Sequence, residues 1–254
     1  MQTVLLIDSD IIAYRIALRN EKSTAFGKVV SELGDACHDA DVAIAELARK
    51  LKADRAILCL SDKANFRKEV LPTYKSNRKD VVRPELLKDV LGYMRDEYEC
   101  NGWPTLEADD VMGIMSTHDH MIEGKKIIVS EDKDMRTIPG YLYAPHRNNL
   151  GVIEVSELDA DRFLCWQAIC GDTTDGYGGA RGVGKTSVFA DEIIAADRED
   201  LWDIVWEAFA SKGFNETDAI QQLQVARILR AEDYNIEKQE IKLCLPENLM
   251  KGVC

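Results

Sequence analysis

TVLLID, at residues 3–8, is a short apolar run that ends on an acidic residue, and the same pattern recurs twice along the chain. RAILCLSD at 55–62 and KKIIVSED at 125–132 also pass from apolar to acidic side chains. Short apolar runs that end at polar residues are typical of buried strands in a parallel sheet. Residues 141–144 and 151–155 predict two shorter strands.

Helical spacing of apolar residues lies between and after these runs. It covers residues 36–53, 85–98 and 106–122. Beyond them, Ser156 is a suitable cap for a helix over 157–169, and helical patterns continue to about residue 232. The alternation predicts an α/β fold, a parallel sheet followed by a helical C-terminal part.

The bulk composition indicates a soluble globular protein. The 254 residues are enough for one large domain or two small ones. Hydrophobic residues make up 46% and charged residues 30%, which disfavours disorder. No run approaches the ~18 apolar residues of a membrane span. The first residues lack the basic start and apolar core of a signal peptide. We expect a cytoplasmic protein with no membrane partner.

The charge is distributed unevenly. A net charge of −13 taken alone argues against a nucleic-acid partner, because phosphate binding rewards cations. Residues 63–83 nevertheless contain seven Lys or Arg and two acidic residues, a local net charge of +5. A substrate anion therefore has one obvious place to bind.

The cysteines and histidines do not show zinc-finger spacing. None of the seven Cys forms a CxxC pair, and the four His lie near no Cys pair. Most of the cysteines are predicted to be buried, reduced packing residues. A zinc ligand pair at His118 and His120 is the weaker interpretation, since that segment resembles the polar end of a helix.

Each of the three apolar runs is followed by acid: Asp8, Asp62, and Glu131 with Asp132. The carboxyl ends of parallel strands lie on one edge of a sheet, where ligands bind. We therefore expect Asp8, Asp62 and Asp132 to lie near each other. Asp134 shares the direction of Asp132 if the chain stays extended.

Two further segments add carboxylates. LEADD supplies Glu107, Asp109 and Asp110 at a helix start, with Glu107 and Asp110 on one face. Asp172 and Asp175 open a Gly-rich stretch with the same three-residue spacing. Five separate acid groups at strand ends, helix starts and a glycine loop are difficult to ascribe to chance.

Clustered carboxylates predict a metal site. They raise each other's pKa, so a protein keeps them close only with strong cations present. Oxygen-only ligands suit Mg²⁺ or Mn²⁺, and two such ions can activate water and stabilise the leaving oxygen of a phosphodiester. The alternative for a single Asp is a turn former or helix cap, the role that we assign to Asp10. Repulsion in the cluster predicts that Asp172→Asn raises the metal-free melting temperature.

The basic segment SDKANFRKEVLPTYKSNRK begins at the second strand end. Pro72 and Pro84 prevent one continuous helix. Its cations could contact phosphates and its rings could stack on bases, whereas the alternative is a solvated charged loop. The candidate contacts are Lys63, Phe66, Arg67, Lys68, Tyr74, Lys75, Arg78 and Lys79.

GARGVGKT at 179–186 matches the P-loop pattern G-x-x-x-x-G-K-[ST]. A P-loop follows a buried strand, and GDTTDGYG before it predicts none. A Gly-rich turn before a helix still exposes backbone N–H groups to an anion, and duplex DNA phosphate is the favoured one. The candidate contacts are Gly182, Gly184, Lys185 and Thr186.

The motifs LLIDSD, SDKANFRKEVLPTYKSNRK, LEADDVMG, VSEDKDM and GDTTDGYGGARGVGKT resemble, in order, those of the 5′-to-3′ exonuclease and flap endonuclease superfamily. Within it, these motifs and the later run ARILRAEDYN are most similar to the exonucleases of T-seven-like podoviruses. The resemblance covers nearly the whole chain. It implies a PIN/FEN-like nuclease core and a helical C-terminal part that contains a helix–three-turn–helix.

The resemblance also implies residue roles in a two-metal nuclease. Asp8, Asp62, Glu107, Asp109 and Asp110 match the family's first acidic group. Its second group corresponds to Asp132, Asp134, Asp172 and Asp175. Tyr74, Lys75 and Arg78 match the helical arch, in which the Lys and Arg contact the substrate phosphate. Residues 176–186 match the helix–three-turn–helix that grips the duplex backbone, often with a bound K⁺.

The activity that the resemblance implies is release of short products from 5′ ends of duplex DNA, with action on flaps, nicks and RNA–DNA hybrids. We expect residues 1–156 to form the core, with an arch segment at 63–100, and 157–254 to form the DNA-binding part, with its motif around 171–196. The expected setting is phage DNA replication and degradation in the host cytoplasm, beside phage replication proteins. The alternatives are a P-loop ATPase and a non-catalytic nucleic-acid-binding module.

Overall fold

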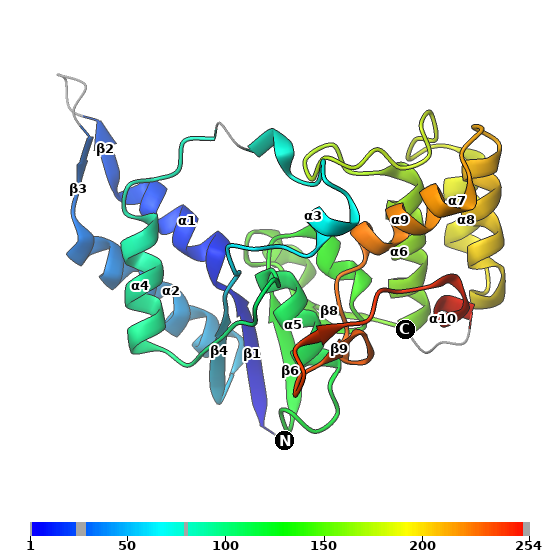
Figure 1. Ribbon diagram of the computed structural model, residues 1–254. Helices are drawn as coiled ribbons and strands as arrows, with labels where there is room; N and C mark the ends of the chain where they lie inside the picture. The colour runs from blue at the N-terminus through cyan, green and yellow to red at the C-terminus, as the bar shows by residue number, and fades with distance from the viewer. Residues whose placement is uncertain (1, 24–28, 79–80, 251–254) are drawn as a thin grey trace. The chain divides into compact units, whose positions relative to one another are not determined.

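The computed structural model describes residues 2–23, 29–78 and 81–250 (Figure 1). Lys79, one of the expected DNA contacts, lies outside these ranges. Clustering of contacts divides the chain into two compact units. We call them the sheet unit, residues 1–63, 81–132 and 141–153, and the helical unit, residues 64–80, 133–140 and 154–254.

The main sheet has the order β5-β4-β1-β6-β7-β8. Every pairing from β5 through to β7 is parallel, as the apolar runs predicted. The strands of this sheet are β1 (Thr3–Asp8), β4 (Arg55–Cys59), β5 (Cys100–Asn101), β6 (Lys125–Val129), β7 (Gly140–Tyr143) and β8 (Val152–Val155). All five runs that predicted strands form strands.

The register of the three central strands aligns their carboxyl ends. Asp8 of β1 is opposite Cys59 of β4, and Ile7 is opposite Val129 of β6. The acidic residues that follow each strand therefore begin at one edge of the sheet, the edge at which α/β sheets bind ligands.

Helices cover the sheet of the sheet unit. They are α1 (Ser9–Asn20), α2 (Leu33–Leu51), α4 (Leu87–Glu97) and α5 (Ala108–Thr117). Helices α1, α2 and α4 share one buried cluster with Leu5 and Ile7 of β1. Side chains alternate along a strand, so the equally buried Val4 and Leu6 point to the opposite face, and α5 packs against β1.

Two helices of the sheet unit differ from the sequence-based expectation. Helix α1 was not predicted; it follows β1 directly, and the side chain of Asp8 caps it by accepting the N–H of Ile11 at 3.2 Å. Helix α5 ends at Thr117 rather than near 122, because Nδ1 of His118 accepts the backbone N–H groups of His120 and Met121. Such side-chain bonds compete with the helical pattern.

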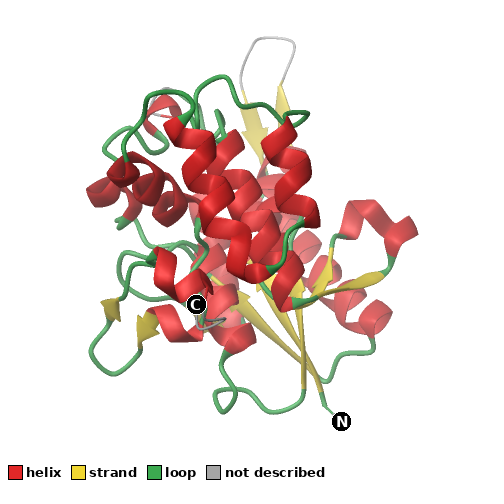
Figure 2. Cartoon of the chain, turned by 90° about the vertical axis from the view of Figure 1, so that its right-hand side faces the viewer, coloured by secondary structure: helices red, strands yellow, loops and turns green. Residues whose placement is uncertain are grey.

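The helical unit is built mostly of helices, drawn in red in Figure 2. Helix α6 packs against α7, α8 and α9 around a common buried cluster. Ser156 caps α6 as predicted, accepting the N–H of Asp159 at 3.1 Å. The helices are α3 (Arg67–Val70), α6 (Glu157–Cys170), α7 (Val188–Ala195), α8 (Leu201–Ala210), α9 (Glu216–Ala226) and α10 (Pro246–Met250).

Short elements complete the described chain. Two small antiparallel sheets pair β2 (Glu21–Ser23) with β3 (Val29–Ser31) and β9 (Tyr234–Asn235) with β10 (Glu240–Ile241). The 3₁₀ helices are η1 (Ser76–Arg78), η2 (Lys133–Thr137), η3 (Pro145–Leu150), η4 (Arg198–Asp200) and η5 (Ala231–Asp233). None of the helices in the described ranges is long and apolar enough to cross a membrane.

The run ARILRAEDYN is structural in the helical unit. Arg227 donates to Asp233 at 2.8 Å, and Arg230 donates to Asp161 of α6 at 2.8 Å. All four side chains are buried. Buried charges require such partners, since an uncompensated one is strongly destabilising.

The helical unit also contains residues 64–80 and 133–140, which the sequence analysis had grouped with the core. The expected functional division near residue 156, with a DNA-binding part beyond it, stays a prediction.

Candidate active site

Asp8 is one of two buried carboxylates among the expected metal ligands that the structure describes in the sheet unit. Its side chain is 3% exposed, caps α1, and accepts the hydroxyl of Ser130 at 2.9 Å. The pKa of Asp8 is raised to about 7, mainly by burial and also by the charges of Asp10 and Asp132, which together outweigh the hydrogen bonds from Ile11 and Ser130. Asp8 therefore lies close to the acid that follows β6, as the parallel strands predicted.

Asp62, after β4, is exposed and held by the backbone. Its two carboxylate oxygens accept the N–H of Lys63 at 2.7 Å and of Thr105 at 2.8 Å. Thr105 has a φ of 63°, in the left-handed region that non-glycine residues rarely adopt. Local backbone strain thus accompanies the positioning of this carboxylate.

Glu107, Asp109 and Asp110 lie at the start of α5. The side chain of Asp110 is fully buried and accepts the N–H of Glu107 at 3.1 Å, and Glu107 returns the bond in a capping box. The predicted shared face of Glu107 and Asp110 is thus partly a helix cap. The negative charge of Asp109 affects the buried thiol of Cys59. The pKa of this thiol is raised first by burial and then by the charges of Asp8 and Asp109.

Asp10, which the sequence analysis assigned to a turn or cap, lies near Glu107. It is mostly buried, and burial raises its pKa. Hydrogen bonds from the hydroxyl and backbone N–H of Ser61 lower that pKa, whereas the charge of Glu107 raises it. Helix α1 brings Asp10 to the acids, and the periodicity of 9–20 was the signal that could have found it.

Glu131 has other partners. It accepts the backbone N–H of His146 at 2.6 Å and lies 3.7 Å from Arg15. Its pKa is raised by burial, but hydrogen bonds from His146 outweigh that effect and lower it overall. We define the sheet-edge acids as the remaining members of this group: Asp8, Asp62, Glu107, Asp109, Asp110 and Asp132.

The sheet-edge acids fit a divalent cation by their chemistry. They supply hard oxygen ligands at one sheet edge, where burial and mutual repulsion already favour a cation. As the side chains stand, no three Asp, Glu, His or Cys groups among the described residues are placed to hold one ion. An ion would therefore require side-chain rotation.

The other expected ligands lie in the helical unit. Burial raises the pKa of Tyr177 well above its ordinary value, and the charges of Asp134, Asp172 and Asp175 raise it further. The three carboxylates therefore surround one buried tyrosine. We call Asp134, Asp172 and Asp175 the helical-unit acids.

Asp172 and Asp134 share a lysine. Nζ of Lys133 lies 2.5 Å from Oδ2 of Asp172 and 3.8 Å from Oδ1 of Asp134. Burial raises the pKa of Asp172, but the bonds from Lys133 and Thr174 outweigh it and lower that pKa below its ordinary value. The sequence analysis did not single out Lys133.

Asp175 binds the three residues that the family resemblance assigned to catalysis. The hydroxyl of Tyr74 donates to Oδ2 at 3.2 Å, Nζ of Lys75 lies 3.7 Å from the same oxygen, and Arg78 donates to Oδ1. Lys75 has a φ of 52°, and its N–H donates to the carbonyl of Asp175 at 2.7 Å. Gly176 makes this approach possible, because a Cβ there would lie 2.7 Å from the carbonyl of Thr73.

Three expected contacts of the basic segment are buried, which corrects their assignment to DNA. Arg67 is 2% exposed and donates to the carbonyls of Val225 and Arg227, where α9 ends. Phe66, 5% exposed, and Tyr74 are also buried, so neither ring offers a face to a base. Charge spacing gave no sign that this segment packs on α9. Lys63 and Lys68 are exposed, as phosphate contacts require.

The structure also contains the Gly-rich segment between α6 and α7. Gly182, Gly184, Lys185 and Thr186 are exposed, and Ser187 caps α7 by accepting the N–H of Ala190 at 3.2 Å. Nζ of Lys185 lies 5.7 Å from the ring centre of Trp166. A loop of this kind before a helix presents N–H groups to an anion.

Sequence comparison decides the family. A family model described as "5'-3' exonuclease, N-terminal resolvase-like domain" matches residues 3–140. The exonuclease of Escherichia phage T7 is 35% identical over 223 residues, 75% of this chain and 73% of that protein. The chain belongs to the 5′-3′ exonuclease family. The exodeoxyribonuclease of Enterobacteria phage T3 is 34% identical over 227 residues, 76% of this chain and 74% of its own.

Solved structures agree with a 5′-3′ exonuclease fold. The phage T5 5′-exonuclease with bound zinc superposes with a TM-score of 0.67 at 18% identity, over 89% of each chain. The phage T5 flap endonuclease in complex with DNA and metal ions gives 0.63 at 19% identity, again over 89% of each chain. The parallel-sheet fold predicted from the sequence is confirmed.

Family membership leaves the P-loop match without support. The motif GARGVGKT follows helix α6 and the isolated β-bridge between Asp172 and Tyr177. No strand leads into it within the described residues, as the sequence analysis expected.

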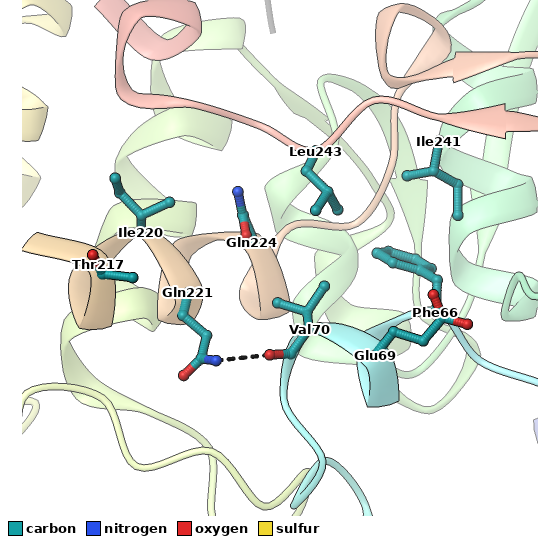
Figure 3. Close-up of a pocket in the computed structure, with 9 residues that line it drawn as sticks. All are labelled: Phe66, Glu69, Val70, Thr217, Ile220, Gln221, Gln224, Ile241 and Leu243. Atoms are coloured by element: carbon teal, nitrogen blue, oxygen red, sulfur yellow. Dashed lines mark hydrogen bonds between the residues drawn. The ribbon is translucent and has the colours of Figure 1, made fainter.

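A pocket of about 410 Å³ in the helical unit is lined by none of the sheet-edge or helical-unit acids (Figure 3). Phe66, Val70, Ile220 and Leu243 form much of its apolar wall, and Gln221 donates to the carbonyl of Val70 at 2.7 Å. The ring of Phe66 thus packs in this apolar wall and not on a nucleic-acid base.

No disulfide joins the cysteines in the described part of the chain. Cys59, Cys165 and Cys244 are buried. His118 and His120 form no zinc site within the described residues, because Nδ1 of His118 accepts backbone N–H groups.

Proposed function

We propose that this chain is a metal-dependent 5′-to-3′ exonuclease that hydrolyses phosphodiesters from the 5′ ends of duplex DNA. The observation that carries the proposal is the alignment of acids at the carboxyl ends of β1, β4 and β6. Asp8 is buried there with a pKa raised to about 7, which a cation would reverse. Flaps, nicks and RNA–DNA hybrids are further proposed substrates.

The proposed cofactor is Mg²⁺ or Mn²⁺, with two ions. The sheet-edge acids are the proposed ligands of one ion, and the helical-unit acids those of the other. Bound divalent ions supply an activated water and stabilisation of the leaving oxygen. The relatives of known structure from phage T5 contain zinc in one case and unspecified metal ions with DNA in another.

The protein's own cations have a proposed role at the phosphate. Lys75 and Arg78 both lie on Asp175, so they carry positive charge close to a proposed ligand. We propose that they neutralise the reacting phosphate, and that the Tyr74 hydroxyl orients Asp175. Charge neutralisation in a partly dry site is worth more than in water, because the effective dielectric is lower.

Duplex binding is proposed for the helical C-terminal part. Lys185, Thr186, Gly182 and Gly184 offer a cation and exposed backbone to a phosphate, with K⁺ as the further ion implied by the family. Exposed Lys63 and Lys68 are proposed as non-specific phosphate contacts. Phage DNA replication and degradation in the host cytoplasm is the proposed setting, with phage replication proteins as partners.

The deciding experiment incubates the full chain with 5′-labelled duplex, nicked, flap and RNA–DNA hybrid substrates. We expect short labelled products in Mg²⁺ and none in EDTA, with restoration when Mg²⁺ is added back. Equal cleavage in EDTA would contradict metal dependence. Products from labelled 3′ ends only would contradict the polarity.

A further inference from the structure

Lys133 lies beside two of the three helical-unit acids, Asp172 and Asp134. Its ammonium is 2.5 Å from Oδ2 of Asp172 and 3.8 Å from Oδ1 of Asp134. The Lys133 side chain is 40% exposed, whereas the side chain of Asp172 is 10% exposed. A partly solvated cation thus contacts a carboxylate that is mostly shielded from solvent.

Both ends of this ion pair are fixed by the fold. Lys133 begins η2, which is anchored by the buried side chains of Met135 and Thr137 and packs against α6. Asp172 follows α6 directly, and its backbone exchanges two hydrogen bonds with Tyr177, at 2.9 and 3.1 Å. Its Oδ1 accepts the N–H of Thr174 at 2.8 Å. The pairing is therefore set by rigid neighbours and does not depend on chance contact between two loops.

We propose that Lys133 is a built-in counter-cation that sets how tightly the helical-unit acids bind a divalent ion. The proposal rests on the proposed function, in which Asp172 and Asp134 are ligands. An ammonium in contact with Oδ2 competes with a metal ion for the same lone pairs. It also lowers the local negative potential that would attract the ion.

The competition makes the two proposed ion sites unequal. Asp8 accepts the hydroxyl of Ser130, and Asp62 accepts the backbone N–H groups of Lys63 and Thr105; these donors carry no net charge. The helical-unit acids have a lysine in contact, so a divalent ion must displace it. We expect a tight ion at the sheet-edge acids and a weak one at the helical-unit acids, with Lys133 as the residue that weakens it.

The test measures Mn²⁺ binding to the full chain without substrate, by calorimetry and by the loss of the free Mn²⁺ electron paramagnetic resonance signal. Wild type is compared with Lys133→Met, which removes the charge and keeps the stem, and with Lys133→Arg, which keeps the charge. Lys212→Met is the matched control, because Lys212 is exposed in the same unit and follows α8. Asp172→Asn reports whether the helical-unit acids bind Mn²⁺ at all.

The expected result is a weaker class of sites that tightens about tenfold in Lys133→Met. Lys133→Arg and Lys212→Met should stay within about twofold of wild type. The Mn²⁺ affinity of the stronger class of sites should not change in any lysine variant. General destabilisation of the protein would not change the spectroscopic signal of one class of Mn²⁺ sites alone. Lys133→Gln, which keeps a hydrogen-bond donor without charge, replaces Lys133→Met if that variant does not fold.

Two failures are distinguishable. If Asp172→Asn abolishes the weaker class while Lys133→Met and Lys133→Gln leave its affinity unchanged or lower, the inference about Lys133 is wrong and the proposed function stands. If Asp172→Asn leaves both classes intact, or wild type binds no Mn²⁺, then the proposed metal role of these acids fails and the inference fails with it.

Discussion

The carboxylates at the sheet edge and the helical-unit acids lie in different electrostatic surroundings. At the sheet edge, Asp8 and Asp10 are buried among other acids, and burial raises their pKa values. In the helical unit, Asp172 has Lys133, and Asp175 has Lys75 and Arg78. The pKa of Asp172 is accordingly below its ordinary value, although burial alone would raise it. The raised pKa values at the sheet edge come mainly from burial, whereas the lowered pKa of Asp172 comes from its contact with Lys133.

Both groups consist of carboxylates, so residue type alone does not determine the electrostatic state of a site. A carboxylate with N–H and hydroxyl partners keeps its charge and remains attractive to a metal ion. A carboxylate in contact with ammonium or guanidinium is already paired, and another cation must displace its partner. Substitutions that remove a charge in either group test this difference.

The largest effect is expected for Asp62→Asn. The substitution keeps one of the two acceptor oxygens and removes the charge of an exposed proposed ligand, so cleavage in Mg²⁺ should fall by about 10³-fold or more. DNA affinity should stay within about threefold, since it rests on cations elsewhere. Single-turnover cleavage and equilibrium DNA binding are the measurements, with Asp96→Asn, at an exposed position of α4, as control. Near-normal turnover would remove Asp62 from the site.

Lys75→Ala and Arg78→Ala should each slow single-turnover cleavage by about 10- to 100-fold and weaken DNA binding much less. The reason is that both cations lie on Asp175, where they are proposed to act on the reacting phosphate. Rapid-quench kinetics at saturating enzyme measures the step directly, with Lys212→Ala as control. A loss confined to binding would identify them as docking groups.

Asp8→Asn should stabilise the metal-free protein at high pH. The folded-state pKa of Asp8 is about 7, well above its ordinary value near 4. The contribution of Asp8 to stability is therefore greatest at low pH, and it is lost as the pH rises from about 4 to about 7. At pH 8 in EDTA, Asp8→Asn should gain on the order of 1 kcal/mol in unfolding free energy, because Asn can still cap α1.

The measurement is urea unfolding of wild type and Asp8→Asn in EDTA at pH 4.5 and pH 8. The advantage of the variant should shrink at the lower pH, where the wild-type carboxyl is protonated. A variant that is less stable at both pH values would mean that Asp8 is charged and paired in the folded protein.

Asp172→Asn should have the smallest effect, with the opposite sign. The folded-state pKa of Asp172 is lowered, so its charge stabilises the fold above its ordinary pKa, and that stability is lost as the pH falls through the folded value. The variant should lose about 0.5–1 kcal/mol at pH 7 in EDTA, the range for a partly exposed ion pair. The sequence alone predicted a gain, and the ion pair with Lys133 is the reason for the reversal.

The check is thermal unfolding at pH 7 and pH 3 in EDTA. The deficit of Asp172→Asn should be present at pH 7 and diminish at pH 3. A higher melting temperature for the variant at pH 7 would restore the picture of repelling acids in both groups.

The sequence predicted the sheet because its signals are local. Apolar runs such as TVLLID and KKIIVS can satisfy burial on both faces only as strands of a covered sheet, and an acid at each end indicates the edge. The cap at Ser156 was readable for the same reason, since one hydroxyl satisfies N–H groups within the same turn. Helix α1 was missed, although it begins at the same Asp8 that ends β1.

The partners of the charged side chains could not be predicted, because they come from distant parts of the chain. Arg67 appears in the sequence as one more cation of a basic segment, yet its guanidinium is buried against the carbonyls of Val225 and Arg227. Lys133 is 39 positions from Asp172. Composition and spacing determined the fold, the acids and the family resemblance. Only tertiary packing decided which charges are paired, because pairing depends on distances in space and on burial, and a one-dimensional pattern contains neither.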